Sequence, residues 1–357
     1  MTAPTLPGPP PTAEPVDFET YSNYGDPSAP SRGGLFRHSA QGDTIRPPYP
    51  IQGRIRAGAP EPGADRSADP AHTTGAQLAG QFPAAPDRYV LYVSLACPWA
   101  QRQLIVRQLK GLQEVIAVAV VDPIRDARGW AFRPGRGLTL DPYNHFTFLS
   151  QAYNATIPDF PGHVSVPVLW DTTTRQIVSN NFPDISLDLG SEFDQWAANP
   201  GLDLYPADLR GEIDALNDRI YRTVNNGVYQ AGGATTQQAY DRAVTALFET
   251  LDDLESRLGD NRHLFGDRLT EADIRLWVTL ARFDAVYATH FKTNRRRLVD
   301  YPNLWDYARR LYQQPAFHET TDFDQIKRHY FITHAHLNPH RIVPIGFEAD
   351  WTAPTRR

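Results

Sequence analysis

The chain has a single cysteine, Cys97, among its 357 residues. One thiol excludes internal disulfides, a Cys-x-x-Cys dithiol cycle and a cysteine-rich zinc site. Any redox turnover must therefore pass through a mixed disulfide with an external thiol, which a second external thiol resolves. The lack of a disulfide framework also favours a reducing compartment.

The sequence also has few lysines, no excess of positive charge and no long apolar run. Only three of the 35 basic residues are lysines, and the net charge of −6 does not favour a nucleic-acid partner. The longest apolar runs, such as 115–121, are too short to span a bilayer. The N-terminus has no basic region followed by an apolar core, as a secretory signal would. We therefore expect a cytoplasmic protein with no membrane or nucleic-acid partner.

Composition and periodicity divide the chain into four parts. Residues 1–85 are rich in proline and glycine and predict an irregular N-terminal arm, partly disordered or draped over the main body. A strand–helix–strand pattern follows over 86–190, and a helical pattern over 200–330, with 331–357 as a C-terminal extension. This order predicts an α/β domain followed by an all-α domain.

Four apolar runs within 86–190 predict strands. The first two are separated by an amphipathic helix at 101–110, which favours parallel pairing, and the last two by a polar turn typical of a hairpin. Between the second and third strands we expect a long loop. Pro167 falls inside the third run, so the Val166–Pro167 bond is a candidate for the cis form. The predicted strands are Tyr89–Leu95, Val115–Val121, Val164–Trp170 and Gln176–Ser179.

The second half of the chain carries apolar stripes at helical spacing, which we assign to the core. Thr270 and Asp273 form a capping-box variant that predicts the start of one helix. The stripes comprise Ile213, Leu216, Ile220 and Val224, and then Tyr240, Val244, Leu247, Leu251, Leu254 and Leu258.

Cys97 lies between the first predicted strand and the helix that follows it. Pro98 suits the first helical position, where a missing N–H is tolerated. Peptide N–H groups of the first helical turn would then point at the sulfur and favour its thiolate. The sequence thus predicts a nucleophilic cysteine; the alternative is a buried cysteine that behaves as a small hydrophobic residue.

Several segments, in order, resemble the signature motifs of the glutathionyl-hydroquinone reductases, the Xi class of glutathione transferases. The resemblance runs from about Tyr89 to the end of the chain. It implies a glutathione-transferase fold, in which a thioredoxin-like domain precedes an all-helical domain, and a homodimer. The segments are Tyr92–Ala100, Gly129–Phe132, Val166–Asp171, Asn225–Tyr229, Leu269–Trp277 and His329–Phe331.

The resemblance implies a role for three residues in catalysis. Cys97 matches the nucleophile, which attacks the sulfur of a thiol–hydroquinone thioether and leaves a mixed disulfide. Tyr229 matches the proposed acid–base group and Tyr330 a tyrosine of the substrate pocket. A carbon leaving group must be protonated as its C–S bond breaks, and a phenol can supply that proton or stabilise the dienone tautomer. The alternative for each tyrosine is a place in the core.

The resemblance also assigns residues to the thiol co-substrate. Trp130 matches a thiol contact. Val166, before Pro167, matches the backbone group that pairs with a cysteinyl amide. Val164, two residues earlier in the same predicted strand, is a further candidate. The sequence departs from the family pattern at two places. His163 stands where an arginine is usual, and Asn181 and Phe182 replace the Glu-Ser pair that holds the γ-glutamyl ammonium and carboxylate of glutathione.

The loss of a carboxylate that pairs with an ammonium weakens binding of that ligand. We therefore favour mycothiol, an N-acetylcysteinyl pseudo-disaccharide, over glutathione as the thiol. Its hydroxyls suit neutral partners such as His163 and Asn181, and its rings an aromatic face such as Phe182 or Trp130. The alternative is drift within a pocket that still uses glutathione.

The leading interpretation is a thiol-dependent reductase of thiol–hydroquinone conjugates. One alternative is a monothiol thioltransferase that acts on mixed disulfides, and another is a non-catalytic quinone-binding protein. No metal is expected. Four histidines near the C-terminus lack an acid or cysteine at a convincing ligand spacing, and we interpret them as a solvated or interface tail: His329, His334, His336 and His340.

Overall fold

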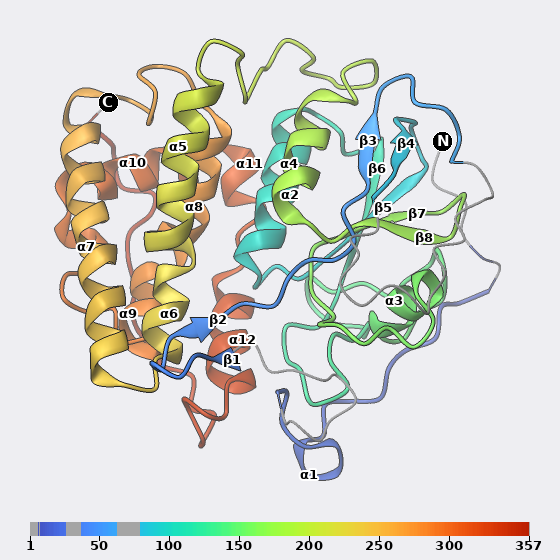
Figure 1. Ribbon diagram of the computed structural model, residues 1–357, viewed down its shortest axis with the longest axis horizontal. Coiled ribbons are helices and arrows are strands. Elements are labelled where there is room, and N and C mark those ends of the chain that lie inside the picture. Colours follow the sequence, from blue (N-terminus) through green and yellow to red (C-terminus); the bar gives the residue numbers. More distant parts are fainter. Residues whose placement is uncertain (1–5, 7, 26–36, 63–78, 357) are drawn as a thin grey trace. The chain divides into compact units, whose positions relative to one another are not determined.

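The computed structural model describes residues 6, 8–25, 37–62 and 79–356, which form two compact units (Figure 1). The first unit contains the described parts of 1–34 and 47–202, and the second those of 35–46 and 203–357. The disorder predicted within residues 1–85 falls partly on 1–5, 7, 26–36 and 63–78, which lie outside the described residues.

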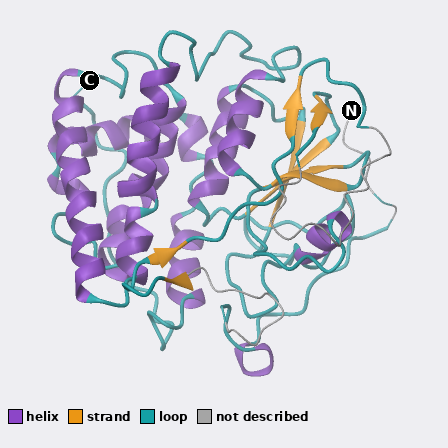
Figure 2. Ribbon diagram, viewed as in Figure 1, coloured by secondary structure: helices purple, strands orange, loops and turns teal. Residues whose placement is uncertain are grey.

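A four-stranded mixed sheet forms the centre of the first unit (Figure 2). The parallel pair and the hairpin expected from the sequence are confirmed, since β5 and β6 run parallel while β7 is antiparallel to β5 and β8. All of β5 is buried, which explains its continuous apolar sequence. The strand order is β6 (Ile116–Val120), β5 (Tyr89–Val93), β7 (Val168–Asp171) and β8 (Gln176–Ser179).

The third predicted strand is shorter than expected, because β7 begins at Val168 rather than Val164. The Val166–Pro167 bond is cis, as predicted, and Pro167 has no N–H to donate to a neighbouring strand. The backbone of Ser165 bonds to a side chain instead. The Tyr153 hydroxyl donates to the Ser165 oxygen at 2.9 Å and lies 3.2 Å from the Ser165 nitrogen. Residues 164–167 therefore form a loop that leads into the sheet.

Helices α2 (Pro98–Leu109) and α4 (Phe182–Ser191) lie side by side in the first unit (Figure 1). Gln103 of α2 joins them, because its Nε2 donates to the main-chain oxygen of Phe182 at 2.6 Å and to the Ser186 hydroxyl at 2.8 Å. A further helix, α3 (Ser150–Thr156), lies in the stretch predicted as a long loop. Its seven residues are too few to show a clear helical period.

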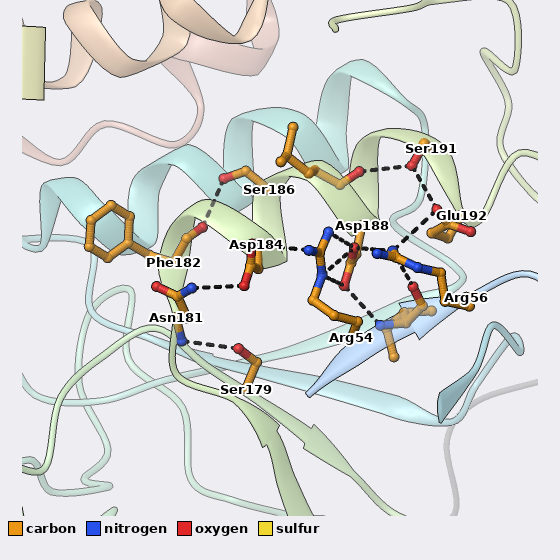
Figure 3. A network of polar contacts seen from close by, with 12 residues as sticks. Arg54, Arg56, Ser179, Asn181, Phe182, Asp184, Ser186, Asp188, Ser191 and Glu192 are labelled. Carbon is orange, nitrogen blue, oxygen red and sulfur yellow. Dashed lines mark hydrogen bonds and ion pairs between the residues drawn. The ribbon is translucent and has the colours of Figure 1, made fainter. Parts of the chain in front are cut away.

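Residues 54–56 of the arm are attached to α4 of the first unit by polar contacts (Figure 3). The short strands β3 (Arg54–Arg56) and β4 (Gln81–Pro83) pair in parallel. Asp188 of α4 is buried and accepts from Arg54 at 2.6 Å and from the Ile55 N–H at 2.8 Å. Arg56 lies between Asp188 and Glu192. Residues 54–56 are therefore packed on the main body, one of the two arrangements that the sequence predicted for the arm.

The second unit is helical and includes a short antiparallel strand pair from the arm, β1 (Arg37–His38) and β2 (Thr44–Ile45). None of its described helices, nor any other described helix, is long and apolar enough to cross a membrane. Its helices are α5 (Arg210–Ile220), α6 (Gly227–Gly233), α7 (Gln237–Asp260), α8 (Glu271–Arg282), α9 (Ala288–His290), α10 (Pro302–Tyr312), α11 (Pro315–His318) and α12 (Phe323–Thr333).

Most of the apolar stripe residues expected in the helical half lie in its core, whereas Leu216, Tyr240 and Val244 are only half-buried. Leu247, Leu251 and Leu258 of α7 are buried. The capping box at the start of α8 is confirmed: Asp273 accepts from the Thr270 N–H at 2.8 Å, and both residues are fully buried. Each helix is therefore held by a buried face rather than by propensity alone.

Candidate active site

Cys97 is the N-cap residue of α2, between the end of β5 and Pro98, the first residue of the helix. This confirms the predicted strand–cysteine–helix arrangement. The thiol is 8% exposed and donates to the main-chain oxygen of Val166 at 3.5 Å. Its position at the N-cap puts the positive end of the helix dipole next to the sulfur. Such a place favours a thiolate, but Cys97 makes no side-chain capping hydrogen bond to the helix, and only the protonated thiol can donate to the Val166 oxygen.

The contact with Val166 puts the sulfur beside the loop that the resemblance assigns to the thiol co-substrate. Val166 and Pro167 are buried, whereas His163 and Val164 remain half-exposed. The backbone that should pair with a cysteinyl amide and the sulfur that should form the mixed disulfide are therefore neighbours. The binding role of these residues stays a prediction.

Asn181 and Phe182 lie at the N-terminal end of α4 (Figure 3). The Asn181 side chain makes no capping hydrogen bond to the helix, and its Nδ2 donates to Asp184 at 2.8 Å. Phe182 is 2% exposed and packs against the ring of Trp99 at a centroid distance of 4.7 Å and against Tyr49 at 5.3 Å. At the position where the resemblance expects a serine, the chain thus has a buried aromatic ring that packs against two others.

The remaining predicted thiol contact, Trp130, lies in the loop after β6 and is 4% exposed. The guanidinium carbon of Arg125 is 4.0 Å from the centre of its ring. Arg125 has no counterpart among the residues singled out from the sequence. A single arginine in a loop carries no periodic or motif signal, so only the fold reveals it.

Three tyrosines meet in the second unit. The Tyr330 hydroxyl is 2.5 Å from that of Tyr229 and 3.0 Å from that of Tyr287. All three are buried, and burial raises the pKa of Tyr229 and of Tyr330 well above the ordinary phenol value. Both therefore stay protonated at neutral pH and keep a hydrogen to donate. Sequence reasoning missed Tyr287, because a tyrosine in an apolar helical stripe is usually core.

Two π-helical turns bring these tyrosines together. The turn Tyr221–Asn225 joins α5 to α6, which carries Tyr229, and the turn Phe283–Tyr287 joins α8 to α9. Asn225 fixes the first turn to α8, because its Nδ2 donates to the Arg275 oxygen and the Thr279 hydroxyl, both at 2.8 Å. Such turns are common at functional sites because they redirect side chains within a helix.

Three histidine rings pack against Tyr330: those of His290, His329 and His334. His290 Nε2 is 3.2 Å from His334 Nδ1, and both rings are buried. The expectation of a solvated or interface tail is therefore wrong for His329 and His334, which pack against Tyr330, whereas His336 and His340 are exposed. Among the described residues, no group of three or more histidine, cysteine or acidic side chains could hold a metal ion.

His290 makes stability depend on pH. Burial, together with the charges of His336 and Lys292, lowers the pKa of His290 to about 4, against about 6.5 in an unfolded chain. The unfolded chain then binds a proton that the folded protein does not, so stability is lost as the pH falls from 6.5 towards 4. We expect His290→Gln to remove up to about 3 kcal/mol of this pH dependence.

Urea unfolding at several pH values between 7 and 4.5 measures this effect. The exposed His340, replaced by glutamine, is the control and should leave the slope of unfolding free energy against pH unchanged. Parallel curves for wild type and His290→Gln would contradict the prediction, whatever the stability of the variant at pH 7.

Comparison with known proteins shows similarity to glutathione transferases. A family model of the glutathione S-transferase C-terminal domain matches residues 237–310. The chain is 50% identical over 279 residues to glutathionyl-hydroquinone reductase YqjG of Escherichia coli (strain K12), an alignment that covers 78% of this chain and 85% of that protein.

Solved structures show the same similarity to glutathione transferases. The glutathione-bound structure of YqjG from Escherichia coli K-12 matches with a TM-score of 0.78 at 46% identity, over 86% of this chain and 96% of that one. The glutathione S-transferase Xi of Phanerochaete chrysosporium matches with a TM-score of 0.77 at 45% identity, over 85% and 97%. The chain therefore has the glutathione-transferase fold and belongs to the glutathionyl-hydroquinone reductases, the Xi class of glutathione transferases.

Proposed function

We propose that this protein is a thiol-dependent reductase that removes a low-molecular-weight thiol from thiol–hydroquinone conjugates. The observation that carries the proposal is the position of Cys97, the chain's one cysteine, at the N-cap of α2 and beside the Val166 backbone. A thiolate at that place is a nucleophile, and the adjacent backbone suits the cysteinyl part of a bound thiol. The Escherichia coli relative is named for this activity.

The reaction balances in two steps. The Cys97 thiolate attacks the conjugate's sulfur and forms an S–S bond, while the electron pair of the broken C–S bond goes to the aromatic carbon. That carbon takes up a proton and the hydroquinone leaves. A second small thiol, as its thiolate, then attacks the mixed disulfide, which releases a disulfide of two small thiols and restores the Cys97 thiolate. In this scheme Tyr229 supplies the proton and is reprotonated by the proton that the second thiol releases on ionising, while Tyr330 and Tyr287 hold its hydroxyl by hydrogen bonding.

Mycothiol is the thiol that we favour. Asn181 offers an amide where the family offers a carboxylate, and Phe182 offers a buried ring where the family offers a hydroxyl. Neither can neutralise the ammonium of a γ-glutamyl group, whereas the Asn181 amide suits sugar hydroxyls. The Phe182 ring is 2% exposed and packed against Trp99 and Tyr49, so the expectation that it presents a face to a sugar is wrong. Glutathione is the second candidate, because a structure of the Escherichia coli relative contains it. We further propose, from the family resemblance, a homodimer that acts in the cytoplasm.

A monothiol thioltransferase would use the same cysteine but would not need a proton donor for carbon. Tyr229→Phe separates the two activities. We expect it to lower kcat for conjugate cleavage by about 10²–10⁴-fold, the usual contribution of a positioned acid. Reduction of a small mixed disulfide should change by less than about threefold, because a thiolate leaves without needing the phenol.

Both rates can be measured on the same preparation. Tyr240→Phe is a matched control, since Tyr240 also lies in a helix of the second unit and its hydroxyl donates to the backbone oxygen of Lys292. If Tyr229→Phe cleaves conjugates as fast as the control, the reductase mechanism is wrong and thioltransferase activity becomes the better interpretation.

A further inference from the structure

Part of the N-terminal arm runs along the loop that carries Trp130. The Ala13 N–H donates to the Phe132 oxygen at 3.0 Å, and the Ala127 N–H donates to the Ser22 oxygen at 3.2 Å. Between them, the Asp17 N–H donates to Asp126 at 3.1 Å. The segment 13–24 is therefore attached along its length to residues 126–132 of the first unit.

Two arginine–tyrosine stacks join the same segments. The guanidinium carbon of Arg125 lies 3.5 Å from the ring centre of Tyr24, and that of Arg128 lies 3.7 Å from the ring centre of Tyr21. Their surroundings differ. Arg125 is 2% exposed, and its guanidinium carbon also lies 4.0 Å from the ring centre of Trp130. Arg128 instead forms an ion pair with Asp126 at 2.7 Å.

Tyr24 also contacts His163, one of the residues that depart from the family pattern. Its hydroxyl is 3.4 Å from Nδ1 of His163, and the two rings meet edge to face at a centroid distance of 6.4 Å. One arm residue thus contacts His163 directly and Trp130 through Arg125. Both are residues that the resemblance assigns to the thiol co-substrate.

We propose that Tyr24 and Arg125 are positioning residues of the thiol-binding site, so that the arm is a working part of that site. This inference rests on the proposed function. A guanidinium between two aromatic rings is attracted to both faces, and its planar shape holds the rings at a set spacing. Arg125 therefore fixes the Trp130 indole, and the Tyr24 hydroxyl fixes the His163 imidazole, before the thiol arrives. A site held in place in this way binds with less loss of side-chain freedom.

The test measures capture of a thiol by Cys97 without any hydroquinone. Cys97 is first converted to its thiopyridyl disulfide with 2,2′-dithiodipyridine. Glutathione, mycothiol or 2-mercaptoethanol is then added, and each thiol displaces pyridine-2-thione, which is followed by its absorbance. The thiol's sulfur bonds to Cys97 and the thiopyridyl group leaves with the electron pair, so the step balances.

We expect Tyr24→Ala to slow capture of the preferred thiol about tenfold and capture of 2-mercaptoethanol by less than about twofold, because the latter has no group to reach Trp130 or His163. Arg125→Met should behave like Tyr24→Ala, and Arg125→Lys should not restore the rate, since lysine lacks the planar fork. The matched control is Tyr21→Ala, which removes the neighbouring stack and should leave both rates within about twofold.

Two phenylalanine variants, which keep the aromatic rings, test the proposal if the alanine variants unfold. Tyr24→Phe removes only the hydrogen bond to His163, and Tyr21→Phe removes only the one to Glu14 at 3.0 Å. We expect about a threefold slower capture for the first and no change for the second. Equal effects of the two positions, or equal slowing of all thiols, would show that the arm is a structural cover and overturn the inference. If wild type captures thiols but cleaves no conjugate, the proposed function fails while the arm's role stands.

Discussion

Replacement of Cys97 by serine should abolish conjugate cleavage, with a loss of kcat of at least about three orders of magnitude. An alkoxide at this place is far harder to form than a thiolate, and an oxygen cannot take part in the mixed disulfide. Intact-mass measurement after incubation with a conjugate should show one bound thiol on the wild type and none on the variant. The mass of the adduct identifies the thiol.

The fold should survive this change. Cys97 and serine differ by one atom, and the sulfur's hydrogen bond to Val166 is one that a hydroxyl can also make. The melting temperature therefore serves as the control. A Cys97→Ser variant that keeps its biological effect, together with a wild type that accumulates no mixed disulfide, would favour the non-catalytic quinone-binding protein.

Restoring a carboxylate at position 181 should shift the thiol preference towards glutathione. A hydrogen bond between an ammonium and a carboxylate contributes about 1.5–3 kcal/mol, which corresponds to roughly a 10- to 150-fold change in binding. We expect Asn181→Glu to raise kcat/KM for glutathione conjugates within that range and to leave mycothiol conjugates unchanged or slower. Competition between the two conjugates in one reaction measures the ratio directly.

The Asn181→Glu variant leaves Phe182 unchanged. Phe182→Ser would complete the family pair, but removing a ring that packs against Trp99 and Tyr49 costs about 3–5 kcal/mol of stability. Asn181→Gln is the matched control, since it has the length of glutamate without the charge. Equal rates with glutathione and mycothiol conjugates in the wild type would end the mycothiol hypothesis. No gain from Asn181→Glu would show that position 181 does not select the thiol.

Local signals were sufficient for much of the first unit. The strand–cysteine–proline–helix arrangement, the parallel pair β5–β6 and the cis bond before Pro167 follow from short segments whose chemistry allows few alternatives. The helix α3 and the strands β3 and β4 were missed. Each has seven residues or fewer, and their positions depend on contacts with distant segments, such as the ion pairs between Arg54 and Asp188.

The sequence alone determined where the single thiol is and that Asn181 and Phe182 stand where the resemblance expects a glutamate and a serine, because both depend on the identity of one or two residues. Only the tertiary structure decided what these two residues contact and which other side chains surround the predicted site residues. Phe182 meets Trp99 across two helices, Tyr287 joins Tyr229 and Tyr330, and Tyr24 covers Arg125 from 101 positions away in the chain. Such contacts arise from packing between segments far apart in the sequence, which local patterns do not encode.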